Sequence, residues 1–193
     1  MLNETSFYTE EELRNLGFSY IGKNNKISKF ARFYGISKIK IGNNVRIDDF
    51  CILSGKIELS DNIHIAAYSA LYGGDEGIYI YDFAGISSRV SVYSCSDDYS
   101  GMAMTNPTIP DVYKKLDKAP VYIEKHVIVG STSVIMPGVT LKEGSSFGCF
   151  SYINHDSEKW SINAGIPFSK IKERRKDLLL LEEKYIQNEK NNE

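Results

Sequence analysis

The sequence is poor in the features that mark several protein classes. It has only three cysteines, Cys51, Cys95 and Cys149, and an odd number scattered in this way is not the framework of a disulfide-stabilised fold. Every apolar run is much shorter than the length of about 18 residues that a membrane-spanning helix needs. The first residues from Met1 on lack the basic and apolar segments of a secretory signal. We therefore expect a cytoplasmic protein without a membrane partner.

An excess of charge of one sign is also lacking. The formal net charge is −2, with 23 basic and 25 acidic residues. A protein that binds nucleic acid through a broad surface is usually strongly basic, so no nucleic-acid partner is expected. A chain of 193 residues can hold one sizeable core, and we expect a single domain over 1–193.

A period of six residues organises the chain. From Ile41 to Leu71 every sixth residue is apolar, and a second residue of inward size precedes most of them by two positions, from Val45 to Ser69. Six is a multiple of the strand period of two and not of the helical 3.6, so both sets lie on one side of an extended chain. The repeat therefore predicts strands.

The same phase returns on both sides of this stretch after short interruptions. The apolar positions are Ile21, Ile27, Phe33, Ile39, Ile41, Ile47, Leu53, Leu59, Ile65, Leu71, Ile80, Ile86, Val92, Ile123, Val129, Ile135, Leu141, Phe147 and Ile153. Hexapeptide repeats are typical of parallel β-helices, whose coils stack at about 4.8 Å. An all-β sandwich, the alternative, does not predict a period of six. We expect an all-β fold, with the β-helix over 21–160.

Three segments depart from the repeat. Segment 1–20 is expected to be a helical cap, since Thr9 and Glu12 form a capping box and Gly17 can end the helix. Segment 94–120 has no period and is expected to be an ordered, functional loop ejected from the coils. Segment 161–193 is expected to form a C-terminal α-helix from about Lys170, with an apolar face made of Ile171, Leu178, Leu181 and Tyr185.

Long stretches of the chain resemble the nucleotide-amino-sugar N-acyltransferases, in particular those that acylate dTDP-4-amino-4,6-dideoxyglucose on the routes to anthrose and viosamine. The stretches are FYTEEEL (7–13), IGNNVRIDDFCILSGKI (41–57), HIAAYSALYGG (64–74), YDFAGISSRV (81–90), DDYSG (97–101), PTIPDVYK (107–114), KHVIVGSTSVIMPGV (125–139) and WSINAGIPFSKIKERRK (160–176). The resemblance implies a left-handed β-helix and transfer of an acetyl or other short acyl group from acetyl-CoA or another acyl-CoA to a dTDP-linked amino sugar for O-antigen or glycan synthesis. It also implies a homotrimer with active sites between subunits.

The loop favours an amine over an alcohol as the acyl acceptor. The related sugar O-acetyltransferases carry a histidine base, but the matching place here looks like Ser96-Asp97-Asp98. A carboxylate is a poor base for an alcohol but adequate to orient an amine, and the departing thiolate of CoA can take the final proton. We expect Asp97 to contact the amine, with Asp98 as second choice. Capping of the loop is the alternative role for both.

Other candidates follow from residue type and place. Ser87, with neighbouring backbone amides, is expected to stabilise the oxyanion, and His64 or His126 could serve a neighbouring subunit's site as base. His155 is expected at the surface. By resemblance, Gly130 and Ser131 lie along the pantetheine track, where they would offer backbone amides to the donor.

Charged and aromatic residues supply candidates for binding the two substrates. A basic cluster could hold a phosphate of CoA. Four further residues could hold the sugar nucleotide by stacking or ion pairing. The cluster is Lys170, Lys172, Arg174 and Arg175, and the sugar-nucleotide set is Tyr72, Tyr93, Tyr113 and Lys114.

Three alternative functions remain open. A sugar O-acetyltransferase of the galactoside or maltose type would need a histidine base, and a non-catalytic trimeric scaffold would have a decayed site. Outward Ile52, Ile128 and Val134 fit a subunit interface in either case. A zinc carbonic anhydrase needs three converging histidines, which the spacing here disfavours, so no metal is expected.

Overall fold

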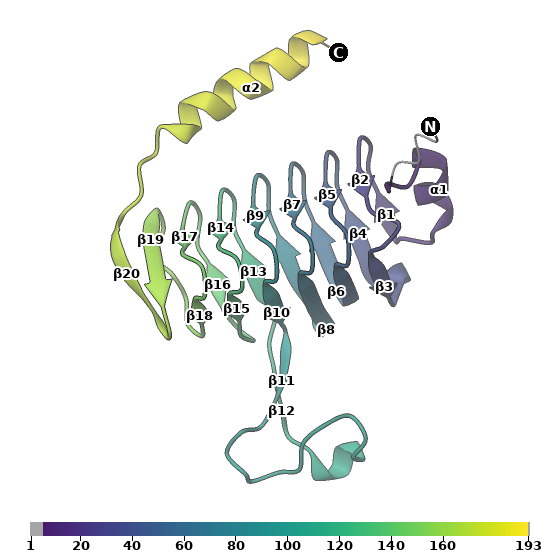
Figure 1. Ribbon diagram of the computed structural model, residues 1–193, viewed down its shortest axis with the longest axis vertical. Coiled ribbons are helices and arrows are strands. Elements are labelled where there is room, and N and C mark those ends of the chain that lie inside the picture. The colour runs from purple at the N-terminus through teal and green to yellow at the C-terminus, as the bar shows by residue number, and fades with distance from the viewer. Residues whose placement is uncertain (1–5, 193) are drawn as a thin grey trace.

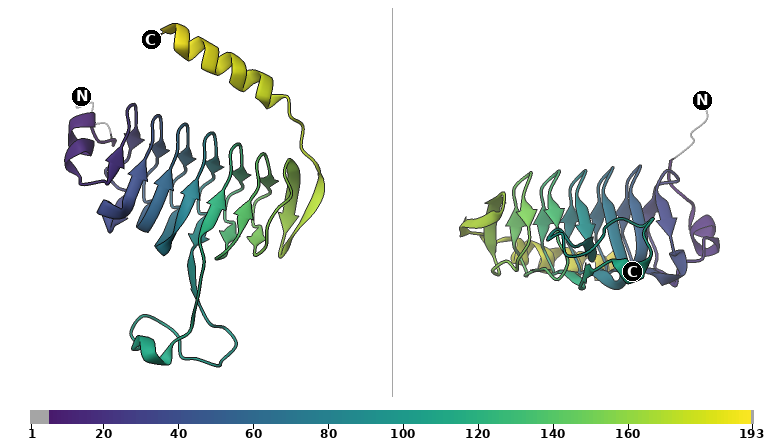
Figure 2. Two further views of the ribbon diagram at one scale, coloured as in Figure 1. Left: turned by 180° about the vertical axis from the view of Figure 1, so that it is seen from behind. Right: turned by 90° about the horizontal axis from the view of Figure 1, so that it is seen from below.

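The chain winds into stacked coils that form a three-sided prism. The computed structural model describes residues 6–192, and of residues 190–192 the backbone alone. Figure 1 shows a helix covering the first coil, a hairpin leaving the prism near its middle, and a long C-terminal helix running back along it. The two further views in Figure 2 show the coils side by side along one axis. This is the left-handed parallel β-helix that the hexapeptide repeat and the resemblance predict.

Each face of the prism is a parallel ladder of short strands. The first face holds β2 (Lys26–Ile27), β5 (Arg46–Ile47), β7 (His64–Ile65), β9 (Gly85–Ile86), β14 (Ile128–Val129), β17 (Ser146–Phe147) and β19 (Ser161–Gly165). The second face holds β3 (Arg32–Tyr34), the first halves of β6 (Ile52–Leu59) and β8 (Ala70–Ile80), then β10 (Ser91–Tyr93), β15 (Val134–Ile135) and β18 (Tyr152–Ile153). The third face holds β1 (Tyr20–Ile21), β4 (Ile39–Ile41), the second halves of β6 and β8, then β13 (Val121–Ile123) and β16 (Thr140–Leu141).

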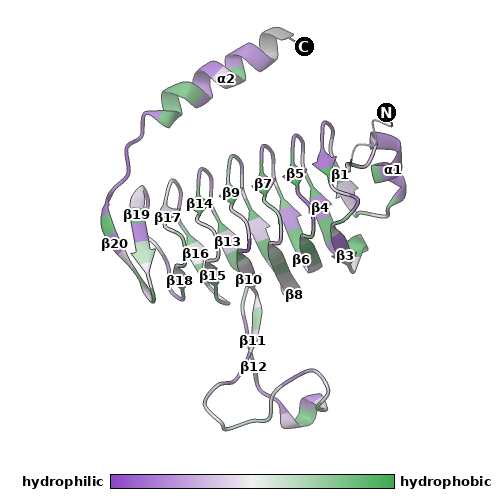
Figure 3. Cartoon of the chain, viewed as in Figure 1, coloured by the Kyte–Doolittle hydropathy of each residue, from purple (hydrophilic) through white to green (hydrophobic). Residues whose placement is uncertain are grey.

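The repeat positions fill the interior of the prism. Every apolar position predicted from the repeat is buried except Ile21 and Phe33, which are half-buried in the first coil and pack against the core. Figure 3 shows apolar residues recurring in the strands of successive coils. Cys51 is an inward residue, as predicted, and all three cysteines are free.

The corners of the prism are built from backbone with positive φ. At the corner between the first and second faces, Phe50, Tyr68 and Phe150 have φ of 61°, 64° and 59°. This conformation costs an L residue on the order of 1–2 kcal/mol, which stacking between coils offsets in part. Phe50 stacks on Tyr68 with ring centroids 5.0 Å apart.

The two ends of the prism differ in how closely they follow the prediction. Helix α1 (Glu10–Asn15) has the predicted capping box, with Thr9 and Glu12 bonded to each other's backbone amides. The prediction of a helix from about Lys170 is wrong. Strand β20 (Phe168–Glu173) runs antiparallel to β19, and α2 (Leu178–Asn192) begins only after it. Gly165, at φ 116°, and Pro167 turn the chain back, so β20 covers the edge of the last coil.

Because the chain forms β20 before α2, the predicted apolar face of the C-terminal helix is only partly present. Ile171 lies in β20 and is exposed, whereas Leu178, Leu181 and Tyr185 line a groove between α2 and the first face. Within the described residues, no helix is long and apolar enough to cross a membrane.

The 94–120 segment is a hairpin that projects from the corner between the second and third faces. Its stem pairs β11 (Cys95–Asp97) with β12 (Leu116–Lys118), and a short 3₁₀ helix, η2 (Asp111–Tyr113), lies in its distal loop. A similar turn, η1 (Ile36–Lys38), lies at the same corner in an earlier coil. The segment thus forms a paired stem with a short helix in its distal loop, and its functional role stays a prediction.

Candidate active site

A cavity of about 550 Å³ lies between the base of the hairpin and the second face. Residues from three successive coils and from the hairpin line it: Tyr93, Cys95, Ser96, Asp97, Tyr99, Val134, Met136 and Tyr152. Asp97 is the single charged group in this set, so the cavity presents one carboxylate among aromatic and apolar side chains. Such a lining suits a small polar ligand with one group that donates hydrogen bonds.

The two loop aspartates have different surroundings. Asp97 ends β11 and is half-buried, and among the described residues its carboxylate accepts one long bond, of 3.4 Å, from the amide of Asn106 to Oδ2. Asp98 caps the loop instead, accepting from the amide and hydroxyl of Ser100 at 3.0 and 2.8 Å. These bonds hold the pKa of Asp98 below its usual range. The capping alternative therefore describes Asp98, whereas Asp97 keeps a carboxylate that faces the cavity.

The aromatic candidates fall into two places. Tyr72 and Tyr93 stack on the second face with centroids 5.1 Å apart, and Tyr93 lines the cavity. Burial raises the pKa of Tyr72. Tyr113 is exposed in η2, and the neighbouring Lys114 pairs with Asp111 at 2.8 Å. Neither Tyr113 nor Lys114 is part of the cavity lining.

Ser87 lies on the first face, directly after β9, and does not line the cavity that holds Asp97. Backbone amides near Ser87 were expected to help stabilise the oxyanion, but two of these amides are already bonded within the prism. The amide of Ser87 donates to Val129 O at 3.0 Å and that of Arg89 to Ala67 O at 3.2 Å. Ser87 can therefore donate a hydrogen bond to the oxyanion through its side-chain hydroxyl. Within a single chain, Ser87 and Asp97 do not line the same cavity.

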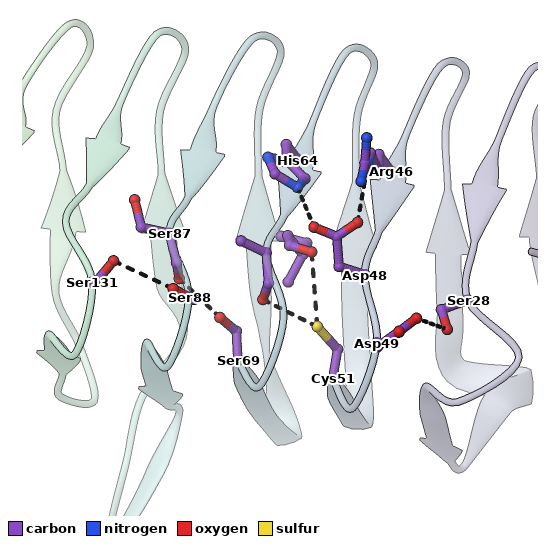
Figure 4. A network of polar contacts seen from close by, with 12 residues as sticks. Ser28, Arg46, Asp48, Asp49, Cys51, His64, Ser69, Ser87, Ser88 and Ser131 are labelled. Atoms are coloured by element: carbon purple, nitrogen blue, oxygen red, sulfur yellow. Dashed lines mark hydrogen bonds and ion pairs between the residues drawn. The ribbon is translucent and has the colours of Figure 1, made fainter. Parts of the chain in front are cut away.

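His64 projects outward from the first face and belongs to a polar cluster that sequence reasoning missed. Its Nε2 bonds to Asp48 Oδ2 at 2.8 Å, and Arg46 Nε donates to Asp48 Oδ1 at 2.7 Å (Figure 4). Burial acts to raise the pKa of Asp48, but the bonds from Arg46 and His64 outweigh it and lower the pKa. The parallel register of β5 and β7, which places Arg46 beside His64, was the signal available for finding this cluster.

The other two histidines have structural partners. His126 is buried at a corner, stacked on Phe83 at 5.3 Å and bonded to Glu182 of α2, so in this chain it is not placed as a base. His155 is exposed and stacks on Phe168 at 4.1 Å. Within residues 6–192 no group of three metal-ligating side chains gathers.

Gly130 and Ser131 mark a close approach of two coils on the first face. A Cβ on Gly130 would lie 2.6 Å from the backbone of Gly148 and Cys149, so only glycine fits. The amide of Gly130 donates to Phe147 O, which corrects the expectation that it is open to a ligand. Ser131 Oγ lies 3.5 Å from Ser88 Oγ.

Three of the basic residues near the C-terminus each bind a different set of partners within the chain. Lys170 pairs with Glu158 and Glu173. Arg174 donates to the carbonyls of two corner residues, His126 and Gly144, and Arg175 pairs with Asp177. In this chain these residues therefore do not form a compact group of open positive charges for a phosphate.

Comparison with known proteins places the chain in a family. No family model matches it. A dTDP-4-amino-4,6-dideoxy-D-glucose acyltransferase from Escherichia coli is 47% identical over 180 residues, covering 92% of this chain and 93% of that protein. The chain therefore has a relative similar over nearly its whole length.

Solved structures agree with this relationship. AntD, an N-acyltransferase from Bacillus cereus, in complex with dTDP and 3-hydroxybutyryl-CoA, is 48% identical with a TM-score of 0.95, covering 97% of this chain and 100% of that chain. A variant of AntD in complex with dTDP-4-amino-4,6-dideoxyglucose and coenzyme A is 48% identical with the same TM-score, covering 96% and 100%. A maltose O-acetyltransferase from Clostridium difficile 630 is 20% identical, with a TM-score of 0.56 over 86% of this chain and 75% of that chain, and shares the fold alone. The chain belongs to the dTDP-4-amino-4,6-dideoxyglucose N-acyltransferases, enzymes built on the hexapeptide-repeat β-helix.

Proposed function

We propose that this chain transfers a short acyl group from acyl-CoA to the 4-amino group of dTDP-4-amino-4,6-dideoxyglucose. Membership of the family supports the two substrates, because relatives hold dTDP, the amino sugar and CoA. The observation that carries the mechanism is Asp97, the single charged group in the cavity under the hairpin. A carboxylate in such surroundings attracts and orients an amine.

The reaction proceeds by direct attack. The lone pair of the neutral amine forms a C–N bond to the thioester carbonyl, and a tetrahedral oxyanion results. Collapse of this intermediate breaks the C–S bond, and CoA leaves as a thiolate. A thiol has a pKa of about 8.5, so the thiolate can take the proton that the amine loses, while Asp97 holds the amine in line. The hydroxyl of Ser87 is the proposed donor to the oxyanion.

We propose that the enzyme is a homotrimer whose sites form between subunits. Asp97 lies on the hairpin beside the second face and Ser87 lies on the first face, so a neighbouring subunit is needed to bring one to the other. An exposed aromatic edge supports an interface: Phe30, Phe50, Tyr68 and Phe150 keep about half or more of their surface open along one corner. Large exposed apolar strips of this kind are typical of subunit contacts. Solved structures of AntD also include variants of a serine and of an aspartate, the two residue types proposed here.

The donor is a short acyl-CoA, with acetyl-CoA and 3-hydroxybutyryl-CoA as the candidates. The second is suggested by the donor bound to AntD. We place the donor along the coil that holds Gly130 and Ser131, and the enzyme in the cytoplasm, where acyl-CoA is made.

An O-acetyltransferase is the second candidate, because the pair of His64 and Asp48 is a base of the kind that an alcohol acceptor requires. A thiol-release assay separates the two. Either acyl-CoA is offered with dTDP-4-amino-4,6-dideoxyglucose, with the dTDP sugar bearing a 4-hydroxyl, or with maltose. Release with the amine alone supports the proposal. Release with the hydroxyl sugars contradicts it and makes His64 the base. No release with any acceptor, and no thermal shift with CoA, would indicate a scaffold.

A further inference from the structure

Three basic side chains form a row across the first face on the first three coils. The parallel register pairs Lys26 with Arg46 and Arg46 with His64. In-register neighbours of parallel strands point to the same side and lie about 4.8 Å apart. All three side chains are exposed. Beyond His64 the same row continues with uncharged residues, Gly85 and Ile128.

A single carboxylate orients two members of this row without using up their donors. Asp48 binds Arg46 through Nε, which leaves both terminal guanidinium nitrogens for another acceptor. It binds His64 through Nε2, which leaves Nδ1. Figure 4 shows the two side chains on either side of Asp48. Lys26 forms no ion pair with any residue in the described part of the chain. The row therefore offers several convergent donors to an anion, the arrangement that suits phosphate groups.

The other acids near the row are bound to partners outside it. Asp49, next to Asp48, accepts a hydrogen bond from Ser28 Oγ. Helix α2 brings Glu182 and Tyr185 into the groove that His64 also lines, and His126 and Arg174 lie in the same groove. Of these, Glu182 is paired with Lys125 and His126. Among the described residues, Asp48 is the one carboxylate that bonds to members of the row, which carries two permanent positive charges and a histidine.

The row lies beside the proposed site. His64 pairs with Gly85, and Ser87 follows two positions later on the same outward side. His64 and Ser87 are separated by the spacing of one coil and by the rise of two residues along a strand, which together amount to about 8 Å. The three basic residues of the row lie in coils before the coil of Ser87. Gly130, which marks the proposed place of the donor, lies in the coil after it. In a nucleotide sugar the sugar ring alone separates the 4-amino group from the diphosphate, so an acceptor reacting near Ser87 can reach the row.

We infer that Lys26, Arg46 and His64 bind the diphosphate of the nucleotide-sugar acceptor, with Asp48 as their positioning residue. The inference rests on the proposed function and gives it a substrate-binding subsite. CoA also carries a diphosphate, but the donor lies on the other side of Ser87. The row replaces Lys114, which pairs with Asp111, as the partner of the nucleotide's phosphates.

Calorimetric titration with dTDP and, separately, with CoA tests this inference. Arg46→Ala is expected to weaken dTDP binding at least tenfold and to leave CoA binding within twofold. Lys26→Ala, which breaks no ion pair within the described structure, is expected to act in the same direction and serves if Arg46→Ala fails to fold. Lys40→Ala is the matched control, because Lys40 is an outward basic residue of the second coil on the third face. It is expected to bind both ligands as the wild type does.

Asp48→Asn separates positioning from charge. It removes a negative charge, yet dTDP binding is expected to weaken because Arg46 and His64 lose their orientation, and the pH dependence of dTDP binding is expected to shift. Unchanged dTDP binding in both Arg46→Ala and Lys26→Ala would overturn the inference, as would selective loss of CoA binding. Failure of the wild type to bind dTDP would also overturn it. Wild-type protein that binds dTDP but releases no thiol from acyl-CoA would instead overturn the proposed function alone.

Discussion

Glu182 of α2 accepts a hydrogen bond from Nε2 of His126 at 2.8 Å, joining residues 56 positions apart. Lys125 pairs with the same carboxylate. The two side chains of the hydrogen bond are almost fully enclosed, with 6% of His126 and 10% of Glu182 exposed. Glu182 therefore fixes the C-terminal helix to a corner of the prism through these two partners. Tyr185 supports it by packing on Phe83 and donating to Asn62 Oδ1 at 3.2 Å.

Replacing Glu182 with alanine is expected to release α2. The change leaves His126 and Lys125 without their partner, and loss of a hydrogen bond to a buried charged group costs about 1.5–3 kcal/mol. Thermal unfolding should occur at a lower temperature, and trypsin should cleave faster at Arg174, Arg175 or Lys176. Glu183→Ala, at the exposed neighbouring position, is the control. Equal melting temperatures and equal cleavage for the two variants would contradict this role.

Acid is expected to loosen the same contact. Burial acts to raise the pKa of Glu182, but the hydrogen bonds and charges of Lys125 and His126 outweigh it and lower the pKa. A carboxylate with a depressed pKa stabilises the folded state above its unfolded pKa, about 4.3, and this stabilisation is lost as the pH falls through the folded value. The difference in melting temperature between wild type and Glu182→Gln should therefore be full at pH 6 and shrink below about pH 4. A difference that stays constant down to pH 3 would be evidence against this linkage.

Asp97→Asn is expected to lower turnover of the amino sugar about tenfold or more, because an amide does not hold the amine as a carboxylate does. Folding should change little, since the side chain of Asp97 accepts a single long hydrogen bond within the described part of the chain. Steady-state thiol release and a thermal melt measure both effects. Asp98→Asn should reduce turnover far less, as Asp98 caps the loop through Ser100. An equal loss in the two variants would make the assignment of Asp97 wrong.

Gly130→Ala is expected to destabilise the prism by about 1–3 kcal/mol through overpacking. Its Cβ would lie 2.6 Å from the backbone of the next coil, which cannot move without breaking the ladder. Gly85→Ala is the matched control on the same face, because its Cβ would meet nothing nearer than 3.9 Å. Denaturant unfolding of the two variants should separate them clearly. Similar midpoints would show that the coils are less tightly stacked than the structure indicates.

Much of the fold was predictable because the inward positions obey one repeated rule. A coil must fill the same interior each time, so residues such as Ile47, Ile65 and Ile86 recur at fixed spacing in the sequence. The capping box of α1 was predictable for a similar reason, since Thr9 and Glu12 interact within a few residues.

The outward contacts were not predictable in this way. Asp48, Arg46 and His64 meet because successive coils are in register. The length of one coil could place Arg46 beside His64, but outward positions carry no repeated residue type that would mark the contact. The pairing of Arg174 with the carbonyls of His126 and Gly144 depends on the turn after Gly165, which the apolar spacing of Ile171 and Leu178 concealed. The amide of Ser87 was expected to be free because the interruption of the repeat at 94–120 hides that Val129 lies beside it.

The hairpin leaves and re-enters the prism at one point. The amide of Ala119 donates to the carbonyl of Ser94 at 3.0 Å, and β8 pairs with both β10 before the hairpin and β13 after it. The coils thus continue as though the intervening residues were absent. Insertions, deletions and exchanges between Cys95 and Lys118 should be tolerated by the fold, so the acceptor chemistry of this architecture can diverge in evolution, or be regrafted by design, while the scaffold that supports it stays the same.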